Sequence, residues 1–175
     1  MLEEDFRNID FLKSGSPTQR AAWDCLESLN ILTQLKEFDP LLAGTIPIGL
    51  NIEGSDLDVL CCFKQADYFR SVVEELFSDK KGFTIKEKTL NQQRSIIASF
   101  FAQGFKIELF GQKTPTEEQL AWRHMIKEWE LLNKYGDKLK SQVIALKRDG
   151  YATEEAFAKA LNLKGDPYEA VLTAK

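Results

Sequence analysis

Apolar residues recur at every third or fourth position over several stretches of the chain, which is the spacing of one face of an α-helix. In the first part of the chain this spacing predicts helices over residues 4–13, 17–35 and 65–78. In the last part it predicts four more, over residues 117–134, 138–148, 153–162 and 167–173.

Residues near the predicted helix ends support these boundaries. Ser16 and Gln19 have the spacing of a capping box, in which a hydroxyl and an amide bond reciprocally to the first backbone N–H groups. Thr116 and Gln119 have the same spacing, which predicts a second capping box. Gly136 separates two of the later helices, since glycine commonly ends a helix.

Shorter apolar or alternating runs predict strands over residues 40–44, 56–63 and 83–90. Residues 94–110 predict a hairpin whose turn is Gln103-Gly104, because glycine supplies the positive φ that a tight turn needs. A two-residue turn at this place pairs Ser99 with Glu108.

All predicted strands fall within residues 1–112, and residues 113–175 are helical throughout. The chain is therefore predicted to be an α+β protein with a small mixed sheet and flanking helices over residues 1–112. The C-terminal helical region, residues 113–175, is predicted to pack on that core as an extension.

Composition narrows the class of protein. The net charge of −4 over 175 residues speaks against a nucleic-acid binder that works through a general basic face. The three cysteines, odd in number and without a C-x-x-C pair, indicate reduced core residues and a cytoplasmic protein. The first ten residues lack the apolar segment of a signal peptide, and no run approaches the ~18 apolar residues of a membrane span. No membrane partner is expected.

Two aspartates stand at the start of the second predicted strand. Because side chains alternate along a strand, Asp56 and Asp58 point to the same face, about 7 Å apart. Glu108 adds a third carboxylate in the otherwise apolar segment FKIELF, where an unpaired buried charge is costly. If the two strands are neighbours, three carboxylates meet on one patch, and oxygen-only ligands favour Mg²⁺ or Mn²⁺.

A small-residue turn precedes the aspartates. Gly44 permits close approach of the backbone to a ligand, and Thr45 offers an N–H and a hydroxyl to a phosphate. A metal patch beside such a turn suits phosphoryl or nucleotidyl transfer, in which catalysis is mostly positioning and charge neutralisation. A plainer alternative stays open, in which the Asp-x-Asp pair serves only the loop and Glu108 pairs with Lys106.

The segments "AGT" and "GSDLDVL" together resemble the signature of the DNA polymerase β-like nucleotidyltransferases. The resemblance covers roughly residues 17–112. The resemblance implies a nucleotidyltransferase-like fold in which Asp56, Asp58 and Glu108 are catalytic and bind Mg²⁺ or Mn²⁺. It implies that an NMP passes from a nucleoside triphosphate to an unknown acceptor, which is a small molecule, a protein or an RNA. The residues expected to contact the nucleotide or its phosphates are Gly44, Thr45, Ser55 and Arg94.

The whole chain, including "GTIPIG", "SDLDVLC", "WRHM" and "GDPYEAVL", is also similar to a bacterial family of nucleotidyltransferase-like proteins of unassigned function. Two residues depart from the superfamily pattern, since Thr45 stands where serine is commonest and Glu108 where aspartate is commonest. A fold does not by itself establish an activity. The alternative expectation is therefore a catalytically inactive protein of this fold that binds a ligand or a partner.

His124 is the only histidine in the sequence. Glu128 lies four residues further on, which predicts a surface His–Glu pair on one helix. In the other interpretation, Arg123 and His124 lie over the nucleotide or the acceptor. Residues 153–172 have the spacing of a helix-turn-helix, but their second helix carries no lysine or arginine, which speaks against DNA binding.

Overall fold

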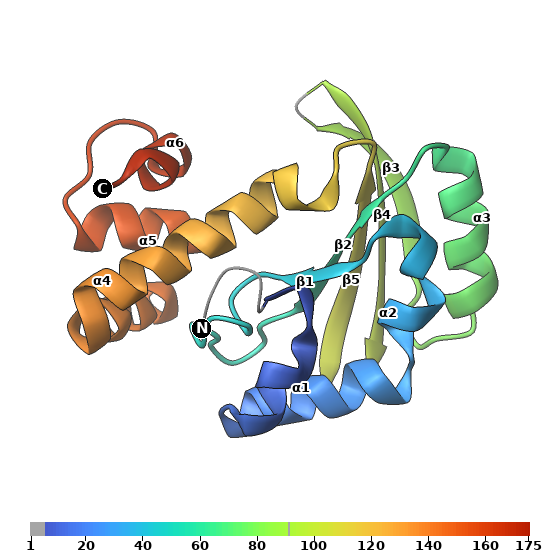
Figure 1. The fold of residues 1–175 in the computed structure, drawn as a ribbon, viewed down its shortest axis with the longest axis horizontal. Helices are drawn as coiled ribbons and strands as arrows, with labels where there is room; N and C mark the ends of the chain where they lie inside the picture. The colour runs from blue at the N-terminus through green and yellow to red at the C-terminus, as the bar shows by residue number, and fades with distance from the viewer. Residues whose placement is uncertain (1–5, 91) are drawn as a thin grey trace.

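The computed structural model describes residues 6–90 and 92–175, and its centre is a five-stranded sheet (Figure 1). The strands are β1 (Leu41–Ala43), β2 (Leu57–Cys62), β3 (Thr84–Leu90), β4 (Gln93–Ala102) and β5 (Phe105–Gln112). They lie in the order β1-β2-β5-β4-β3, in which β2 and β5 are parallel and all other neighbours are antiparallel. The mixed sheet and the α+β class are as predicted.

Helices stand before, between and after the strands. Those of the first part are α1 (Pro17–Ser28), α2 (Ile31–Gln34) and α3 (Ala66–Phe77), with short 3₁₀ helices η2 (Ile9–Ser14) and η3 (Lys36–Phe38). The sheet is followed by η4 (Thr116–Glu118), α4 (Leu120–Arg148), α5 (Thr153–Ala160) and α6 (Pro167–Thr173). In the described part of the chain, no helix combines the length and the apolar character needed to cross a membrane.

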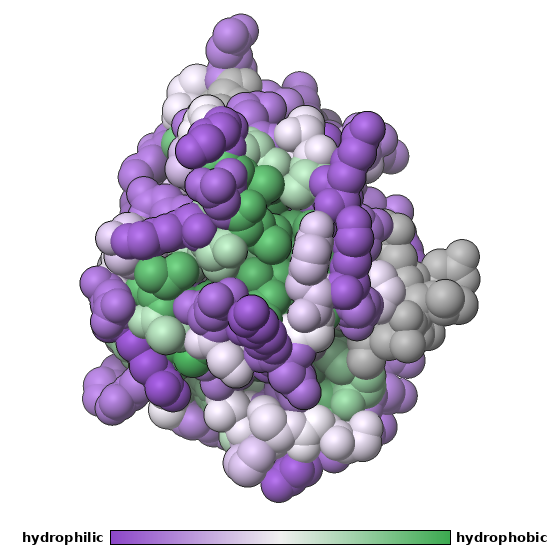
Figure 2. All heavy atoms as spheres, turned by 90° about the vertical axis from the view of Figure 1, so that its left-hand side faces the viewer, coloured by the Kyte–Doolittle hydropathy of each residue, from purple (hydrophilic) through white to green (hydrophobic). Residues whose placement is uncertain are grey.

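The two faces of the sheet are covered by different parts of the chain. Helices α1 and α3 pack on one face, whereas the C-terminal helices lie on the other side (Figure 1). Successive strand residues point to opposite faces, so Val59 of β2 joins the first core and Leu60 joins the second. On the surface, the side with the C-terminal helices shows apolar side chains exposed between charged ones (Figure 2).

The predicted hairpin is confirmed together with its register. Ala102 pairs with Phe105 and Ser99 pairs with Glu108 across the β4–β5 turn. Gly104 in this turn has a φ of 85°, a backbone conformation that glycine adopts without steric cost. The capping box of α1 is also confirmed, because the Ser16 and Gln19 side chains bond reciprocally to each other's backbone N–H groups.

Two predictions for the first helices are corrected. The helix predicted over 4–13 is a 3₁₀ helix at Ile9–Ser14, and residues 4 and 5 lie outside the described residues. The helix predicted over 17–35 is broken at Asn30, whose φ of 50° is left-handed, a conformation that asparagine tolerates better than most residues. The break redirects the chain, and both Ile31 and Leu35 are buried in the first core.

In the C-terminal region one predicted helix boundary is corrected and another is confirmed. The capping box predicted at Thr116 and Gln119 is wrong, because Gln119 Nε2 donates instead to the Cys61 and Thr114 carbonyls at 2.9 and 3.0 Å. This side chain thereby ties the start of α4 to β2. The predicted break at Gly136 is confirmed. The element α4 contains two helical parts that meet at a kink at this glycine, whose backbone angles (φ 68°, ψ −160°) are not helical.

Candidate functional site

The predicted carboxylates come from adjacent parallel strands. Asp58 of β2 lies opposite Glu108 of β5 in the register of the sheet, and Asp56 directly precedes β2. Two residues further along each strand, Leu60 and Phe110 pack in the second core with α4. Strand alternation therefore places Asp58 and Glu108 on the face of the sheet that the C-terminal helices cover. The condition set by the sequence, that these two strands are neighbours, is met.

The glycine turn touches this pair of strands directly. Gly44 follows β1, in which Ala43 pairs with Asp58, and it has a φ of 86°. A Cβ atom added to Gly44 would lie 2.5 Å from Oδ2 of Asp58, so only glycine leaves room for the carboxylate. The loop after the turn is held by a hydrogen bond of 2.9 Å from the Leu50 N–H to the Thr45 carbonyl.

Burial and charge act together on Asp58. Desolvation, followed by the negative charges of Glu108 and Asp56, raises the pKa of Asp58 to about 7. The Lys106 ammonium donates to Oδ2 of Asp56 at 2.6 Å, and this hydrogen bond raises the pKa of Lys106. The possibility that Lys106 pairs with Glu108 is therefore not realised, because the lysine bonds to Asp56.

A cavity of about 360 Å³ lies between the aspartates and the C-terminal helices. Its lining includes residues from the loop and the sheet on one side and from α4 and α5 on the other, namely Gly44, Thr45, Ser55, Asp56, Asp58, His124, Glu128, Lys147 and Glu154. A second cavity of about 280 Å³ is lined by Asp58 together with Glu108, Phe110 and Leu120. Asp58 and Ala121 line both cavities, so the Asp58 carboxylate stands at their boundary.

The donor set at the sheet fits a hard divalent cation in type. Asp56, Asp58 and Glu108 offer only carboxylate oxygens, and a bound cation would offset both the burial and the neighbouring negative charges that raise the pKa of Asp58. Among the described residues, these three do not form a cluster with ligand atoms within 4.8 Å of one another, and Asp56 bonds to Lys106. Ser55 Oγ, which accepts a 3.0 Å hydrogen bond from the Ile52 N–H, shapes the loop beside them.

The structure does not bring either predicted arginine to this cavity. The Arg94 side chain bonds to Glu87 at 2.6 Å and to Asp67 at 2.7 Å, and it lines a separate cavity with Lys64 and Lys113. Arg123 is exposed on α4 and belongs to neither of the cavities that Asp58 lines. The alternation of side chains along the strand did not indicate that Arg94 would form ion pairs with Glu87 and Asp67.

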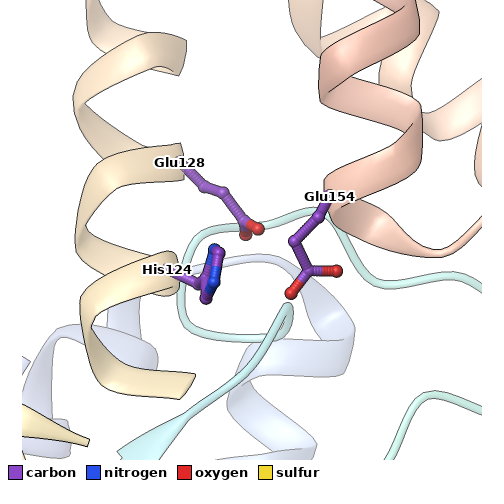
Figure 3. Close-up of side chains that lie close together, drawn as sticks. All are labelled: His124, Glu128 and Glu154. Carbon is purple, nitrogen blue, oxygen red and sulfur yellow. The ribbon is translucent and has the colours of Figure 1, made fainter. Parts of the chain in front are cut away.

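The prediction of a surface His–Glu pair is wrong. His124 is 6% exposed and Glu128 is 3% exposed, because α4 turns both side chains toward the sheet and α5. Burial lowers the pKa of His124 and raises that of Glu128 well above its ordinary value. Glu154, at the start of α5, joins them, and the three side chains point toward one another (Figure 3).

Sequence reasoning missed two residues of this cavity, Lys147 and Glu154. Lys147 is 8% exposed, and burial lowers its pKa. In the sequence both residues stand in charged, helix-like surroundings that look solvated, and no motif marks them. Only the packing of α4 and α5 against the sheet brings them to Asp58.

Comparison with solved structures identifies the fold. A crystal structure of the Cid1 poly(U) polymerase with MgGTP matches with a TM-score of 0.53 and 18% identity, over 73% of this chain and 41% of that one. The structure of the GLD-2/RNP-8 complex matches with a TM-score of 0.54 and 15% identity, over 91% of this chain and 63% of that one. The chain spans less than half the length of the first of these. No curated protein matches the sequence significantly.

The fold and the paired strand carboxylates thus define a protein of the nucleotidyltransferase-like fold class. Within this class, residues 24–174 match the family described as a domain of unknown function, DUF4269, and the chain belongs to that family.

Proposed function

We propose that the protein is a metal-dependent nucleotidyltransferase that passes an NMP group from a nucleoside triphosphate to an acceptor hydroxyl. One observation carries this proposal: Asp58 and Glu108 lie opposite each other on parallel strands, with Gly44 packed against Oδ2 of Asp58. In a nucleotidyltransferase-like fold, this arrangement supplies carboxylates for a cation next to a turn open to phosphate.

In this proposal Asp56, Asp58 and Glu108 hold Mg²⁺ or Mn²⁺, which supplies charge neutralisation at the phosphates. Gly44, Thr45 and Ser55 line the cavity next to Asp58 and face the triphosphate. A bond forms between the acceptor oxygen and the α-phosphorus while the bond from that phosphorus to pyrophosphate breaks. The hydroxyl proton passes to solvent, so the products are the NMP ester, pyrophosphate and one proton.

We propose a small molecule, in preference to RNA, as the acceptor, on the basis of the cavity next to Asp58. Four carboxylates line it, from Asp56, Asp58, Glu128 and Glu154, against one lysine, Lys147. A lining with a single lysine offers a phosphate backbone little attraction beyond the proposed metal ions, and the net charge of the chain is −4. RNA and protein acceptors therefore serve as comparison substrates when NMP transfer is measured.

The first test is isothermal titration of ATP, GTP, CTP and UTP into the protein, with Mn²⁺ or with EDTA. Nucleotide binding is expected in the presence of Mn²⁺ but not in the presence of EDTA. The substitution Asp58→Asn is expected to abolish this binding. Asp79→Asn is the matched control, because this aspartate is 74% exposed and pairs with Lys80 away from the cavity. Nucleotide binding that persists in Asp58→Asn, or that ignores EDTA, would contradict the proposed site.

A second candidate function is supported by the 2.6 Å bond between Lys106 and Asp56. If this lysine permanently replaces a cation, the protein is a catalytically inactive nucleotidyltransferase fold that binds a ligand or a partner. Transfer of label from [α-³²P]NTP to any acceptor would eliminate this candidate. Nucleotide binding that is insensitive to EDTA, is lost in Lys106→Gln and is not followed by transfer would favour it.

A further inference from the structure

A second group of metal-ligating side chains lies across the cavity from the sheet carboxylates. His124 and Glu128 stand one turn apart on α4, and Glu154 reaches them from the start of α5 (Figure 3). One ligand atom from each of the three lies within 4.8 Å of the other two. Among the described residues, no other three histidine, cysteine or carboxylate side chains come this close together.

Two of these side chains, His124 and Glu128, are buried and lack, among the described residues, the partners that buried polar groups usually have. His124 is 6% exposed, and its Nδ1 has no hydrogen-bond partner in the part of the chain that the structure describes. Glu128 is 3% exposed, and within residues 6–90 and 92–175 it forms neither a hydrogen bond nor an ion pair. A buried carboxylate and a buried imidazole left in this state are costly unless a further group binds them.

Lys147 does not supply that group. Its charge lowers the pKa of Glu128, which places it nearby, but over the described residues it forms no ion pair within 4.0 Å. Tyr168 packs edge-on against the His124 ring with centroids 5.9 Å apart, which fixes the ring without satisfying Nδ1. The cluster therefore keeps one imidazole and two carboxylates directed at a common point.

We propose that His124, Glu128 and Glu154 form a metal site, separate from the sheet carboxylates, that takes a transition-metal ion of the Zn²⁺ type. A mixed nitrogen and oxygen donor set suits Zn²⁺, whereas Mg²⁺ prefers oxygen alone. Three protein ligands leave a fourth position for water or a ligand group. The cavity that these residues share with Asp58 contains that position, so the ion is available to a bound molecule.

The single histidine makes the test direct. Chelator-treated full-length protein without a histidine tag is titrated with Zn²⁺, in the absence of nucleotide, by calorimetry and by ¹⁵N NMR of the imidazole. One Zn²⁺ per chain is expected, with a large shift of a ring nitrogen of His124. No Zn²⁺ binding, or binding that leaves the imidazole signals unchanged, would overturn the proposal.

Substitutions of the proposed ligands distinguish this site from other possible Zn²⁺-binding sites on the protein. Glu128→Gln and Glu154→Gln should each weaken Zn²⁺ binding about tenfold or more. Glu130→Gln is the matched control on the same helix, because Glu130 is half-exposed and pairs with Lys127. Equal affinity in Glu128→Gln, Glu154→Gln and Glu130→Gln would overturn the proposal.

Two further variants test the nearest competitors. Cys62 is a partly exposed thiol, and loss of Zn²⁺ binding in Cys62→Ser would assign the ion to it and overturn the proposal. Loss of Zn²⁺ binding in Asp58→Asn but not in Glu128→Gln would assign the ion to the sheet carboxylates and would also overturn the proposal. Because nucleotide is absent throughout, neither outcome depends on whether the protein transfers nucleotides. If Glu128→Gln fails to fold, as judged by thermal denaturation, Glu154→Gln at the less buried helix start gives the same test.

Discussion

At the scale of single residues, the contact between Gly44 and Asp58 is the tightest constraint in the candidate site. Gly44 combines a left-handed backbone with a position that leaves no space for a side chain beside Oδ2 of Asp58. Gly54, in the same loop, has a similar φ of 81° but open space around it. A substitution at Gly54 therefore introduces backbone strain alone, whereas a substitution at Gly44 introduces backbone strain and a steric clash with Asp58.

Gly44→Ala should lose metal-dependent nucleotide binding and also some stability, whereas Gly54→Ala should lose only stability. Each alanine must adopt a positive φ, which costs roughly 1–3 kcal/mol of unfolding free energy. The alanine at position 44 also displaces the Asp58 carboxylate. Urea denaturation and nucleotide titration of both variants check this, and equal nucleotide binding in the two would show that the close approach does not matter.

The raised pKa of Asp58 predicts a stability that depends on pH. The folded protein holds the Asp58 proton up to about pH 7, whereas the ordinary value is 3.8. Between these values the folded state binds more protons, so the free energy of unfolding falls as pH rises. Asp58→Asn lacks this group, and its stability relative to wild type should rise from pH 4 to 7 by on the order of 4 kcal/mol and then level off.

Urea denaturation from pH 4 to 8 without metal measures this difference, and Asp79→Asn, with its exposed carboxylate, should follow wild type at every pH. Mn²⁺ should restore wild-type stability at pH 8, because a bound cation favours the charged carboxylate. A constant difference between wild type and Asp58→Asn over this range would contradict the prediction.

At the scale of elements, the parallel pairing of β2 with β5 brings Asp58 and Glu108 together, and α3 supports β5 from the other face. The contact between α3 and β5 is close at Gly111. A Cβ atom there would collide with the ring of Phe69, the nearest ring atoms including Cδ1 at 2.8 Å. The absence of a side chain at Gly111 thus sets how near α3 lies to the sheet.

Gly111→Ala should lower the free energy of unfolding by about 1–3 kcal/mol, because a well-packed core does not accept an added methyl group without strain. Phe69→Leu should also destabilise the protein, but it removes the colliding ring. The double variant should therefore be more stable than the sum of the single effects by at least about 0.5 kcal/mol. Additive losses in denaturant unfolding would show that the two residues do not collide.

At the scale of the whole molecule, the main candidate cavity exists only where the C-terminal helices meet the sheet. Asp56 and Asp58 contribute one wall, and His124, Glu128 and Glu154 contribute the other. The same helices bury the second face of the sheet. The division into a core of residues 1–112 and an extension of residues 113–175 stays a prediction, and residues from both parts line this cavity.

A fragment of residues 1–112 should not fold cooperatively, because Leu41, Leu60 and Phe110 would lose their cover on that face. Thermal denaturation and binding of a hydrophobic dye measure this. A truncation after residue 165 removes only α6 and should still unfold cooperatively, at a lower temperature, because it loses the buried Val171. Cooperative unfolding of the shorter fragment without dye binding would show that the core is independent.

The sequence alone determined the features that depend on neighbours along the chain. Strand periodicity, the Ser16 capping box and the two-residue turn at Gly104 led to the observed strands, to the start of α1 and to the Ser99–Glu108 register. The spacing of Asp56 and Asp58 indicated a shared face, and the isolated Glu108 indicated a partner strand. Each of these depends on local backbone geometry, which a few adjacent residues specify.

The tertiary structure alone decided which charges meet. Lys106 bonds to Asp56, and Arg94 is held by Glu87 and Asp67, although the sequence left both basic residues free for other partners. His124 and Glu128 are buried, and Glu154 reaches them from a helix far along the chain. Burial and ion pairing depend on how α4 and α5 pack against the sheet, and such contacts between distant segments leave no periodic or local pattern in the sequence.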